Sequence, residues 1–374
     1  MIFKLHTGLL TLFVFAAVPA LAQKDQKEQE YLTVKFQKFP IANFPENAAP
    51  VSSIRLIQKM ADSTDLGYAL KGMSGRVIKI KPAKPLTGFF QEHINRMYKS
   101  EYKKDAPTML WLLHDLHMSG KTVGIRYAYT RIIADAYLSD EGGLFAKLFS
   151  MDTTLITEST DLFTSDPATA IEDAFRLLTK RSFQSAGDGS FRTVKGITLE
   201  QIAQQSGQNI SLPVFTDTLY TEGVYANFAE FQQNKPSITS YKKINLEKNK
   251  TRLVKAESNS DTGSINAWGV CEKGVIYKFD DGYLVMIEKQ ANGFVISGYT
   301  ETMSRINRDF YYKRMSGAPV GGITGALISV EAYKAALNTL MDKVILVKSI
   351  PYITDPLQQP IASCIDMKTG EWSF

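Results

Sequence analysis

The feature that most constrains the fold of this 374-residue chain is a regular alternation of strand-like runs and short turns between residues 265 and 299. Each run is rich in apolar, β-branched and aromatic side chains, and each turn carries a glycine, which adopts a positive φ at little cost. Turns spaced this evenly are typical of antiparallel hairpins. We therefore predict a four-stranded β-meander. Its strands are 265–272, 275–279, 283–289 and 294–299, with turns at 272–274, 280–282 and 291–293.

The N-terminal half mixes strand-like and helical patterns. Residues 85–98 place apolar side chains at helical spacing, and a second helix should begin at Pro167, with Asp166 as its cap. The expected strands are 51–60, 75–81, 109–118, 124–138 and 144–158, with turns at 119–121 and 140–143. Residues 51–184 therefore predict an α+β domain in the order ββα-βββα, an antiparallel sheet with helices on one face.

Two further regions complete the predicted organisation. Residues 185–264 should form a linker with short helices, because capping-box spacing occurs at Thr198 and Gln201 and again at Asn227 and Glu230. Residues 265–374 should form a second α+β domain. Besides the meander, this domain is expected to hold an amphipathic helix near 330–341, a strand at 344–350 and a final hairpin turned at 368–370.

Residues 1–22 have the order of a secretory signal peptide. A basic residue, Lys4, precedes an apolar run, and small residues follow up to Ala22, so cleavage is expected between Ala22 and Gln23. Residues 23–50 should form an extended leading segment. The apolar run is too short for a transmembrane span, and no later run reaches that length. We therefore expect a periplasmic or extracellular protein without a membrane span.

Charge and composition narrow the classes of partner. The chain has 43 Lys and Arg against 38 Asp and Glu, a net charge of +5 that is spread along the sequence. This balance gives no reason to expect nucleic acid as a partner. A pI near 8.9 favours loose contact with anionic lipid or polysaccharide at a cell surface. No cofactor motif is present, and we expect no cofactor.

The chain has two cysteines, Cys271 and Cys364. In an oxidising compartment they could form a disulfide that closes a long loop and stabilises the fold by about 4–5 kcal/mol. The alternative is two buried free thiols, because the sequence cannot show whether the Cα atoms approach to within about 7 Å.

Histidines and a carboxylate gather only at His114, Asp115 and His117, which are therefore the candidates for a metal or acid-base site. In a regular strand Asp115 and His117 point one way and His114 the other, which separates the ligands. A zinc site would also need a third protein ligand that no nearby motif supplies. The sequence therefore favours a structural role, and it contains no recognisable nucleophile motif.

Aromatic side chains provide the remaining candidate site. Phe310, Tyr311 and Tyr312 are adjacent and are followed by Arg314. Aromatic faces with a neighbouring cation could stack on sugar rings or form a protein interface. These four residues are the predicted binding residues, although most aromatic residues in the chain should belong to the core.

Two segments resemble known groups of proteins. Residues 223–231 with 234–237, and the strand Ala267-Trp268-Gly269-Val270-Cys271, are similar to elements of exported Bacteroidota proteins of unknown function. This resemblance covers roughly 215–300 and implies a bacterial, extracytoplasmic protein. Residues 51–183 resemble, in their order of elements alone, small periplasmic lipoprotein-like domains that assist envelope transport. That second likeness is one of fold and does not assign function.

The sequence thus predicts an exported, non-catalytic protein that binds or assembles in the bacterial cell envelope, with an envelope protein or a glycan as partner. The alternative is a secreted hydrolase acting on glycan or peptide. Its carboxylates, or His114, Asp115 and His117, would be brought together only by folding.

Overall fold

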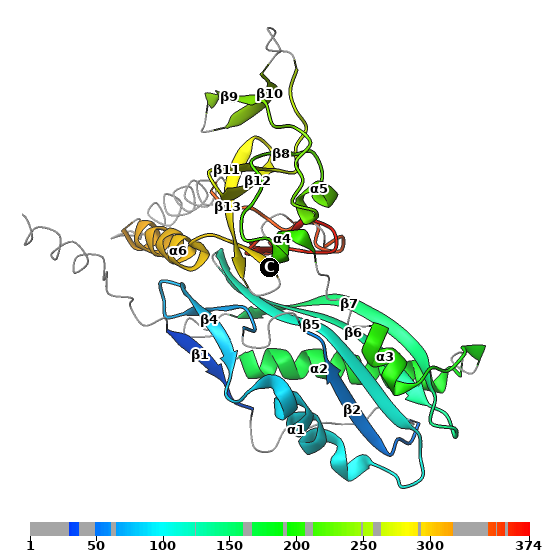
Figure 1. The fold of residues 1–374 in the computed structure, drawn as a ribbon. Coiled ribbons are helices and arrows are strands. Elements are labelled where there is room, and N and C mark those ends of the chain that lie inside the picture. Colours follow the sequence, from blue (N-terminus) through cyan, green and yellow to red (C-terminus); the bar gives the residue numbers. More distant parts are fainter. Residues whose placement is uncertain are drawn as a thin grey trace, which may run out of the picture. The chain divides into compact units, whose positions relative to one another are not determined.

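The structure is a computed structural model of the chain. It describes residues 30–36, 49–60, 65–123, 125–159, 167–189, 193–205, 212–247, 250–256, 263–290, 293–316, 343–348, 350–355 and 358–374. The expected signal segment with Ala22 and Gln23, and the expected helix near 330–341, lie outside these ranges. Every helix within them is too short or too polar to span a membrane. Helices combine with mainly antiparallel sheets, so the predicted α+β class is confirmed (Figure 1).

A four-stranded sheet forms the centre of the N-terminal half (Figure 1). Its strands follow the order β2 (Ser53–Gln58), β5 (Thr108–Val123), β6 (Ile125–Ser139) and β7 (Phe145–Ser159). The three long strands are antiparallel neighbours joined by short connections. Strand β2 runs parallel to β5, which requires the long crossover that lies between them in the sequence.

The hairpin between β5 and β6 turns later than predicted. Ser119, Gly120 and Lys121, the expected turn, lie inside β5 and pair with β6. Gly120 marks a close contact instead, because a Cβ on it would lie 2.8 Å from Cγ of Leu70. Lys121 is buried and its ammonium donates to the Gln359 carbonyl, 2.7 Å away. The prediction of a turn at 119–121 is therefore wrong.

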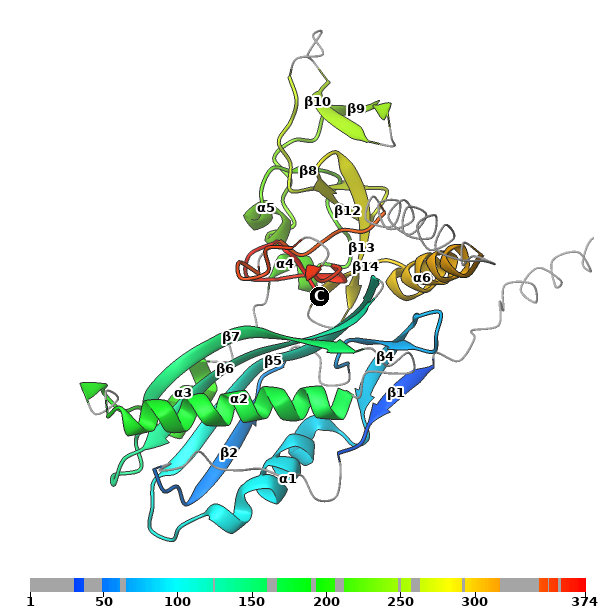
Figure 2. The same ribbon diagram turned by 180° about the vertical axis from the view of Figure 1, so that it is seen from behind.

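Two amphipathic helices cover one face of this sheet. Helix α1 (Leu86–Tyr98) is followed by the 3-10 turn η2 (Lys99–Glu101), and α2 (Pro167–Gly187) begins at the predicted proline. Figure 2 shows α2 running along the sheet. The indole N–H of Trp111 on β5 donates to Ser182 Oγ on α2 at 3.0 Å. The fully buried residues of this core include Ile54, Phe90, Ile94, Trp111, Ile132, Ile171, Phe175 and Leu178.

A three-stranded sheet lies next in the fold. Its order is β1 (Tyr31–Val34), β4 (Arg76–Pro82) and β3 (Tyr68–Lys71). The sequence predicted β4 but not β3. Gly67, immediately before β3, forms a bridge with Met118 of β5, so the small sheet is anchored to the large one.

Helix α6 (Tyr299–Ser316) was not predicted, since its residues are polar and aromatic rather than amphipathic by pattern. It contacts the N-terminal half through side-chain hydrogen bonds. Ser304 Oγ accepts from the Val77 N–H at 2.9 Å, and Asn307 Nδ2 donates to the Gly75 carbonyl at 2.8 Å. Contacts with β3 and β4 therefore position this helix.

The segment 185–264 holds more structure than the predicted linker with short helices. Both capping boxes are confirmed: Gln201 N–H donates to Thr198 Oγ1 at 3.2 Å, and Glu230 N–H donates to Asn227 Oδ1 at 3.0 Å. Strand β8 joins a large sheet, and β9 and β10 form a separate ribbon. The elements are α3 (Leu199–Gln205), α4 (Pro213–Thr216), β8 (Gly223–Tyr225), α5 (Phe228–Gln232), β9 (Tyr241–Asn245) and β10 (Thr251–Lys255).

The predicted meander is confirmed and forms the middle of a seven-stranded sheet. The strand order is β16-β15-β14-β13-β12-β11-β8. The final hairpin, also predicted, supplies β15 and the edge strand β16. The strands are β11 (Gly269–Glu272), β12 (Val275–Asp280), β13 (Tyr283–Gln290), β14 (Gly293–Ile296), β15 (Cys364–Ile365) and β16 (Trp372–Ser373).

The buried His93 of α1 should make stability depend on pH. It is fully buried, stacks on Phe36 at 3.7 Å between ring centroids, and has Glu172 Oε1 3.7 Å from its Nε2. Burial, with smaller effects from Arg96 and Arg176, lowers its pKa from 6.5 to about 4. Between these values the unfolded chain binds a proton that the folded chain excludes. Stability contributed by neutral His93 is complete above pH 6.5 and is lost as the pH falls toward 4.

We therefore expect the free energy of unfolding to fall by about 2–3 kcal/mol from this residue between pH 6.5 and 4. His93→Phe should flatten that part of the profile, since phenylalanine does not titrate. Urea denaturation of both proteins at several pH values measures the difference. Parallel profiles for the two proteins would contradict the assignment to His93.

Candidate functional site

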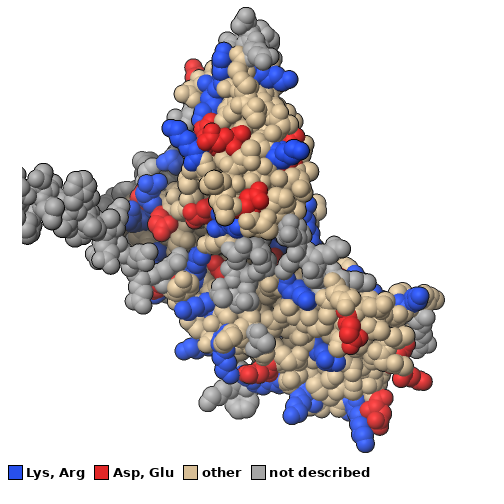
Figure 3. Space-filling model, viewed as in Figure 1, with Lys and Arg blue, Asp and Glu red and all other residues tan. Residues whose placement is uncertain are grey.

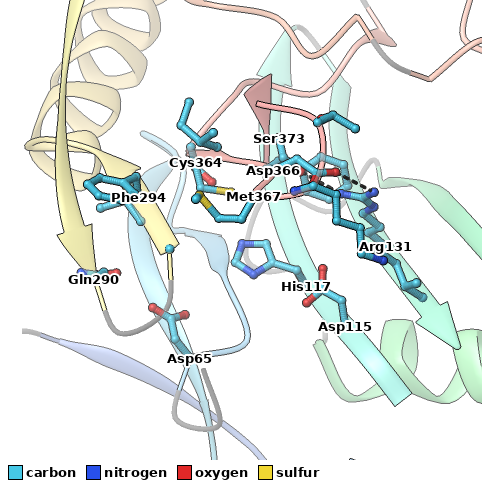
Figure 4. A pocket seen from close by; sticks show the side chains of 18 of the residues that line it. Asp65, Asp115, His117, Arg131, Gln290, Phe294, Cys364, Asp366, Met367 and Ser373 are labelled. Atoms are coloured by element: carbon cyan, nitrogen blue, oxygen red, sulfur yellow. Dashed lines mark hydrogen bonds and ion pairs between the residues drawn. The ribbon is translucent and has the colours of Figure 1, made fainter. Parts of the chain in front are cut away.

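A cavity of about 370 Å³ lies between the four-stranded sheet and the C-terminal half of the meander sheet. Figure 4 shows its side chains arriving from elements far apart in the sequence. Asp115 and His117 come from β5, Arg131 from β6, Phe294 from β14, and Cys364 from β15. A volume of this size is within the range of small-molecule sites, which often lie between packed layers.

A β-bulge at His114 determines which residues of β5 face this cavity. Leu113 pairs with Ala134 and Asp115 with Ile133, so His114 is an extra residue in β5. Before the bulge, the side chains of β5 that face the helices belong to the odd-numbered residues Met109, Trp111 and Leu113. After the bulge, they belong to the even-numbered residues Leu116 and Met118. The bulge therefore turns Asp115 and His117 away from the apolar core, where they would be costly to bury.

The bulge also changes the expected position of His114. In a regular strand it would point away from Asp115 and His117, but all three residues line the same cavity. The imidazole Nε2 of His114 lies 2.9 Å from Asp135 Oδ2 on β6. The prediction that His114 faces the opposite side is therefore wrong, because a regular alternation was assumed through residue 114.

Asp135 holds the His114 side of the cavity in place. Its carboxylate also accepts from Ser150 Oγ at 2.6 Å and pairs with Lys147 Nζ at 2.9 Å. Burial alone would raise its pKa, but the hydrogen bonds from His114, Ser150 and Lys147 outweigh burial and hold the pKa well below its usual range. Asp135 is therefore an anion, and the Nε2 of His114 is occupied by its hydrogen bond to this carboxylate.

Arg131 ties the sheet to the C-terminal hairpin. Its Nε and Nη2 bind the two carboxylate oxygens of Asp152 at 3.1 and 3.0 Å. Nη1 donates to Ser373 Oγ at 2.9 Å, and Nη2 lies 3.4 Å from Asp366 Oδ2 (Figure 4). Burial opposes its charge, but the hydrogen bond to Asp152 and the charges of Asp152, Asp366 and Asp115 raise its pKa. The guanidinium is fully engaged with protein partners.

His117 and Asp115 differ from these engaged groups. Figure 4 shows the His117 ring pointing into the cavity, and its Nε2 is buried without a hydrogen-bond partner among the described residues. Burial raises the pKa of Asp115, although His117 and Arg131 counter that effect. Burial also raises the pKa of the Cys364 thiol to about 12. The cavity therefore offers an imidazole nitrogen, a carboxyl with a raised pKa and an unreactive thiol.

The residues weighed above as a metal site and as a disulfide form neither within the described ranges. In the described ranges no three His, Cys, Asp or Glu side chains are arranged to hold a metal ion, so His114, Asp115 and His117 do not constitute one there. Cys271 and Cys364 are free thiols. They lie on β11 and β15, four strand positions apart or about 19 Å, too far for a disulfide. Of the two alternatives that the sequence leaves open, the structure has the two free thiols.

The predicted aromatic binding residues lie elsewhere, on α6. Phe310 is buried, whereas Tyr312 is 62% exposed and stands beside Tyr311 with ring centroids 5.6 Å apart. Arg314 belongs to the same helix, and Phe310, Tyr311 and Tyr312 do not line the cavity. Binding by these residues stays a prediction.

Sequence reasoning missed Arg131, Asp135 and Asp366. Arg131 and Asp135 alternate with Ile133 on β6, and polar residues within an otherwise apolar strand were the available signal. Nothing in the sequence relates them to Asp366, which lies more than two hundred residues away.

Comparisons with known proteins add little. No family model and no curated protein matches the sequence. Among solved structures, the chain is similar to the protein XCC0632 from Xanthomonas campestris, described under the family model DUF330. The identity is 14%, the match covers 43% of this chain and 99% of that one, and the TM-score is 0.30. A likeness of this degree carries no argument about function.

Proposed function

We propose that this is an exported, non-catalytic binding protein of the bacterial cell envelope that holds a small molecule, or a group of a larger partner, in the cavity beside His117. The observation that carries the proposal is the buried Nε2 of His117, which has no hydrogen-bond partner in the described part of the chain and lies at the wall of a cavity of about 370 Å³. A buried polar atom without a partner is costly, and a ligand would relieve that cost.

The residues that line the cavity indicate which kind of ligand would fit it. Beside His117 the cavity is lined by apolar side chains, including Phe294, Ile365, Met367 and Phe374. Arg131 is occupied by Asp152, Asp366 and Ser373, so it is not available to hold a strongly anionic group. The fitting ligand is mainly apolar and carries a hydrogen-bonding group that meets the imidazole.

Export and an envelope location rest on the sequence. The signal-like order of residues 1–22 supports export, and the resemblance of 215–300 to exported Bacteroidota proteins supports a bacterial envelope. We propose as partner an envelope protein or a glycan bearing an apolar substituent, because either would be present in the cell envelope and either could place an apolar group in the cavity.

A secreted hydrolase is the second candidate, and one observation favours it. Asp115, with a raised pKa, lies two residues from His117 in the same cavity, an arrangement that resembles an acid-base pair. Against it, the Cys364 thiol is not activated, because burial raises its pKa to about 12. Turnover of a glycan or peptide that is abolished in Asp115→Asn would favour the hydrolase.

Replacing His117 should weaken ligand retention. We expect protein purified from its native envelope to carry a small-molecule adduct in native mass spectrometry, and His117→Leu to reduce its occupancy at least tenfold, because the hydrogen bond is lost. His114→Gln is the matched control, since glutamine can still reach Asp135. Absence of any adduct, or equal occupancy in His117→Leu, would contradict the proposal.

A further inference from the structure

A second cavity, of about 890 Å³, lies between the β10 strand, the β12 strand and the C-terminal hairpin. It is lined by Arg252 of β10, by Trp268 and Lys278, and by Thr369 and Glu371 of the hairpin. The function proposed above makes no use of it. Basic side chains gather over the β9–β10 ribbon above it, with acidic ones among them (Figure 3).

Lys278 is the unusual residue of this cavity. It is only 5% exposed, and its Nζ lies 4.9 Å from the ring centroid of Trp268 and 5.4 Å from that of Trp372. Both indoles are fixed: Trp268 Nε1 donates to the Gly370 carbonyl at 2.8 Å, and Trp372 Nε1 donates to Asp280 Oδ2 at 2.9 Å. The ammonium is therefore held between two ring systems whose positions are set by other contacts.

The Lys278 ammonium lacks an acceptor. Within the described chain it forms no ion pair and no hydrogen bond, and its Nζ lies over the two indole rings. Asp280 and Glu371 act on it only from a distance, and burial outweighs them to lower the pKa of Lys278. An ammonium has three N–H donors, and within the described chain none of those of Lys278 meets an acceptor. A ligand or partner with a hydrogen-bond acceptor could pair with the Lys278 ammonium.

The surroundings restrict the kind of anion. Asp280, Asp281 and Glu371 line the same cavity. Their negative charges would repel a dianion such as phosphate more strongly than a single carboxylate. A carboxylate also matches the single positive charge of the Lys278 ammonium. Lys250 is already paired with Asp281 at 2.9 Å. Phe228 provides an apolar surface beside Trp268, with ring centroids 5.3 Å apart, and Ile265, Ala267 and Phe279 line the cavity from a neighbouring apolar cluster.

The occupied faces of Trp268 argue against a sugar. Phe231 stacks on the indole with ring centroids 4.2 Å apart, and Lys278 covers the ring as well. Stacking on a sugar ring needs an open aromatic face. An apolar surface beside a cation instead matches the C-terminus of a peptide. The terminal carboxylate would meet the cation, and the last side chain, if apolar, would meet the apolar surface.

We propose that this cavity binds the free C-terminal carboxylate of a peptide or protein partner, with Lys278 Nζ donating to the carboxylate and the apolar surface receiving the last side chain. This cavity shares only Thr369 with the lining of the cavity beside His117, and neither Lys278 nor His117 lines both, so this inference does not rest on the proposed function.

The test uses an N-acetylated tripeptide ending in leucine, as the free acid and as the C-terminal amide. Titrations follow calorimetric heat and tryptophan emission, because two of the three tryptophans flank Lys278. We expect the acid to bind at least tenfold more tightly than the amide. Lys278→Met, which keeps a long apolar side chain between the indoles, should lose at least tenfold of the affinity for the acid.

Lys289→Met is the matched control. Lys289 lies on the neighbouring strand β13 with its Nζ 5.8 Å from the Phe215 ring, outside the cavity, and its loss should leave binding unchanged. Equal binding of acid and amide, no binding of either, or full affinity in folded Lys278→Met would each overturn the proposal. Binding of trigalacturonate in place of the peptide would also overturn it and would identify an acidic glycan site.

Discussion

Replacing Arg131 with methionine is expected to lower the free energy of unfolding by about 3 kcal/mol. The guanidinium binds both oxygens of Asp152 and also contacts Ser373 and Asp366. Its removal therefore eliminates the side-chain contacts of Arg131 with the C-terminal hairpin. Methionine keeps much of the volume but leaves Asp366, whose side chain is 19% exposed, without its cation. Breaking such a pair on one side costs more than the pair contributes.

Equilibrium urea denaturation measures this loss, and Lys84→Met is the control. Lys84 also forms an ion pair, with Glu92 at 3.1 Å, but the two side chains are 64% and 56% exposed. Its loss should cost less than about 1 kcal/mol. Arg131→Lys should also be destabilising, because lysine cannot make the two-pronged contact with Asp152. If Arg131→Met were no worse than Lys84→Met, the strand pairing and the tryptophan hydrogen bonds of the hairpin would be sufficient to hold it without Arg131.

Local signals in the sequence were sufficient for much of the fold. The meander followed from three glycine-bearing turns, and α2 begins at Pro167 because proline suits the first turn of a helix. The capping boxes at Thr198 and Asn227 formed as their spacing predicted. In each of these cases the residues that determine the structure are neighbours in the chain.

Features set by distant contacts could not be predicted. The bulge at His114 has no local signature, yet it decides that Asp115 and His117 line the cavity rather than the helix-facing core. The sequence predicts a turn at Gly120, whereas the structure has this glycine in close contact with Leu70. The cavity itself depends on β15 and β16 joining the meander, a pairing between segments about seventy residues apart. The candidate site could therefore be named only in part, through His114, Asp115 and His117.

Gly67→Ala should have the largest effect of any substitution considered, about 4 kcal/mol or more, and should leave little folded protein. Gly67 has φ +99°, and a Cβ on it would lie 2.0 Å from the Met118 carbonyl oxygen and 2.9 Å from Nε2 of His117. The clash is with backbone, which cannot rotate away. Relieving it would separate Gly67 from β5 and break the hydrogen bond from the Met118 N–H to the Leu66 carbonyl, 2.9 Å long.

Gly72→Ala separates the two causes of this effect. Gly72 also has a positive φ, +69°, but a Cβ on it would have no atom within 4 Å. Its substitution should therefore cost only the backbone strain, about 1–2 kcal/mol. The yield of soluble protein and the urea midpoint compare the two variants. A similar small loss in both would mean that β3 can move away from β5 freely, and that the wall beside His117 is not fixed by this contact.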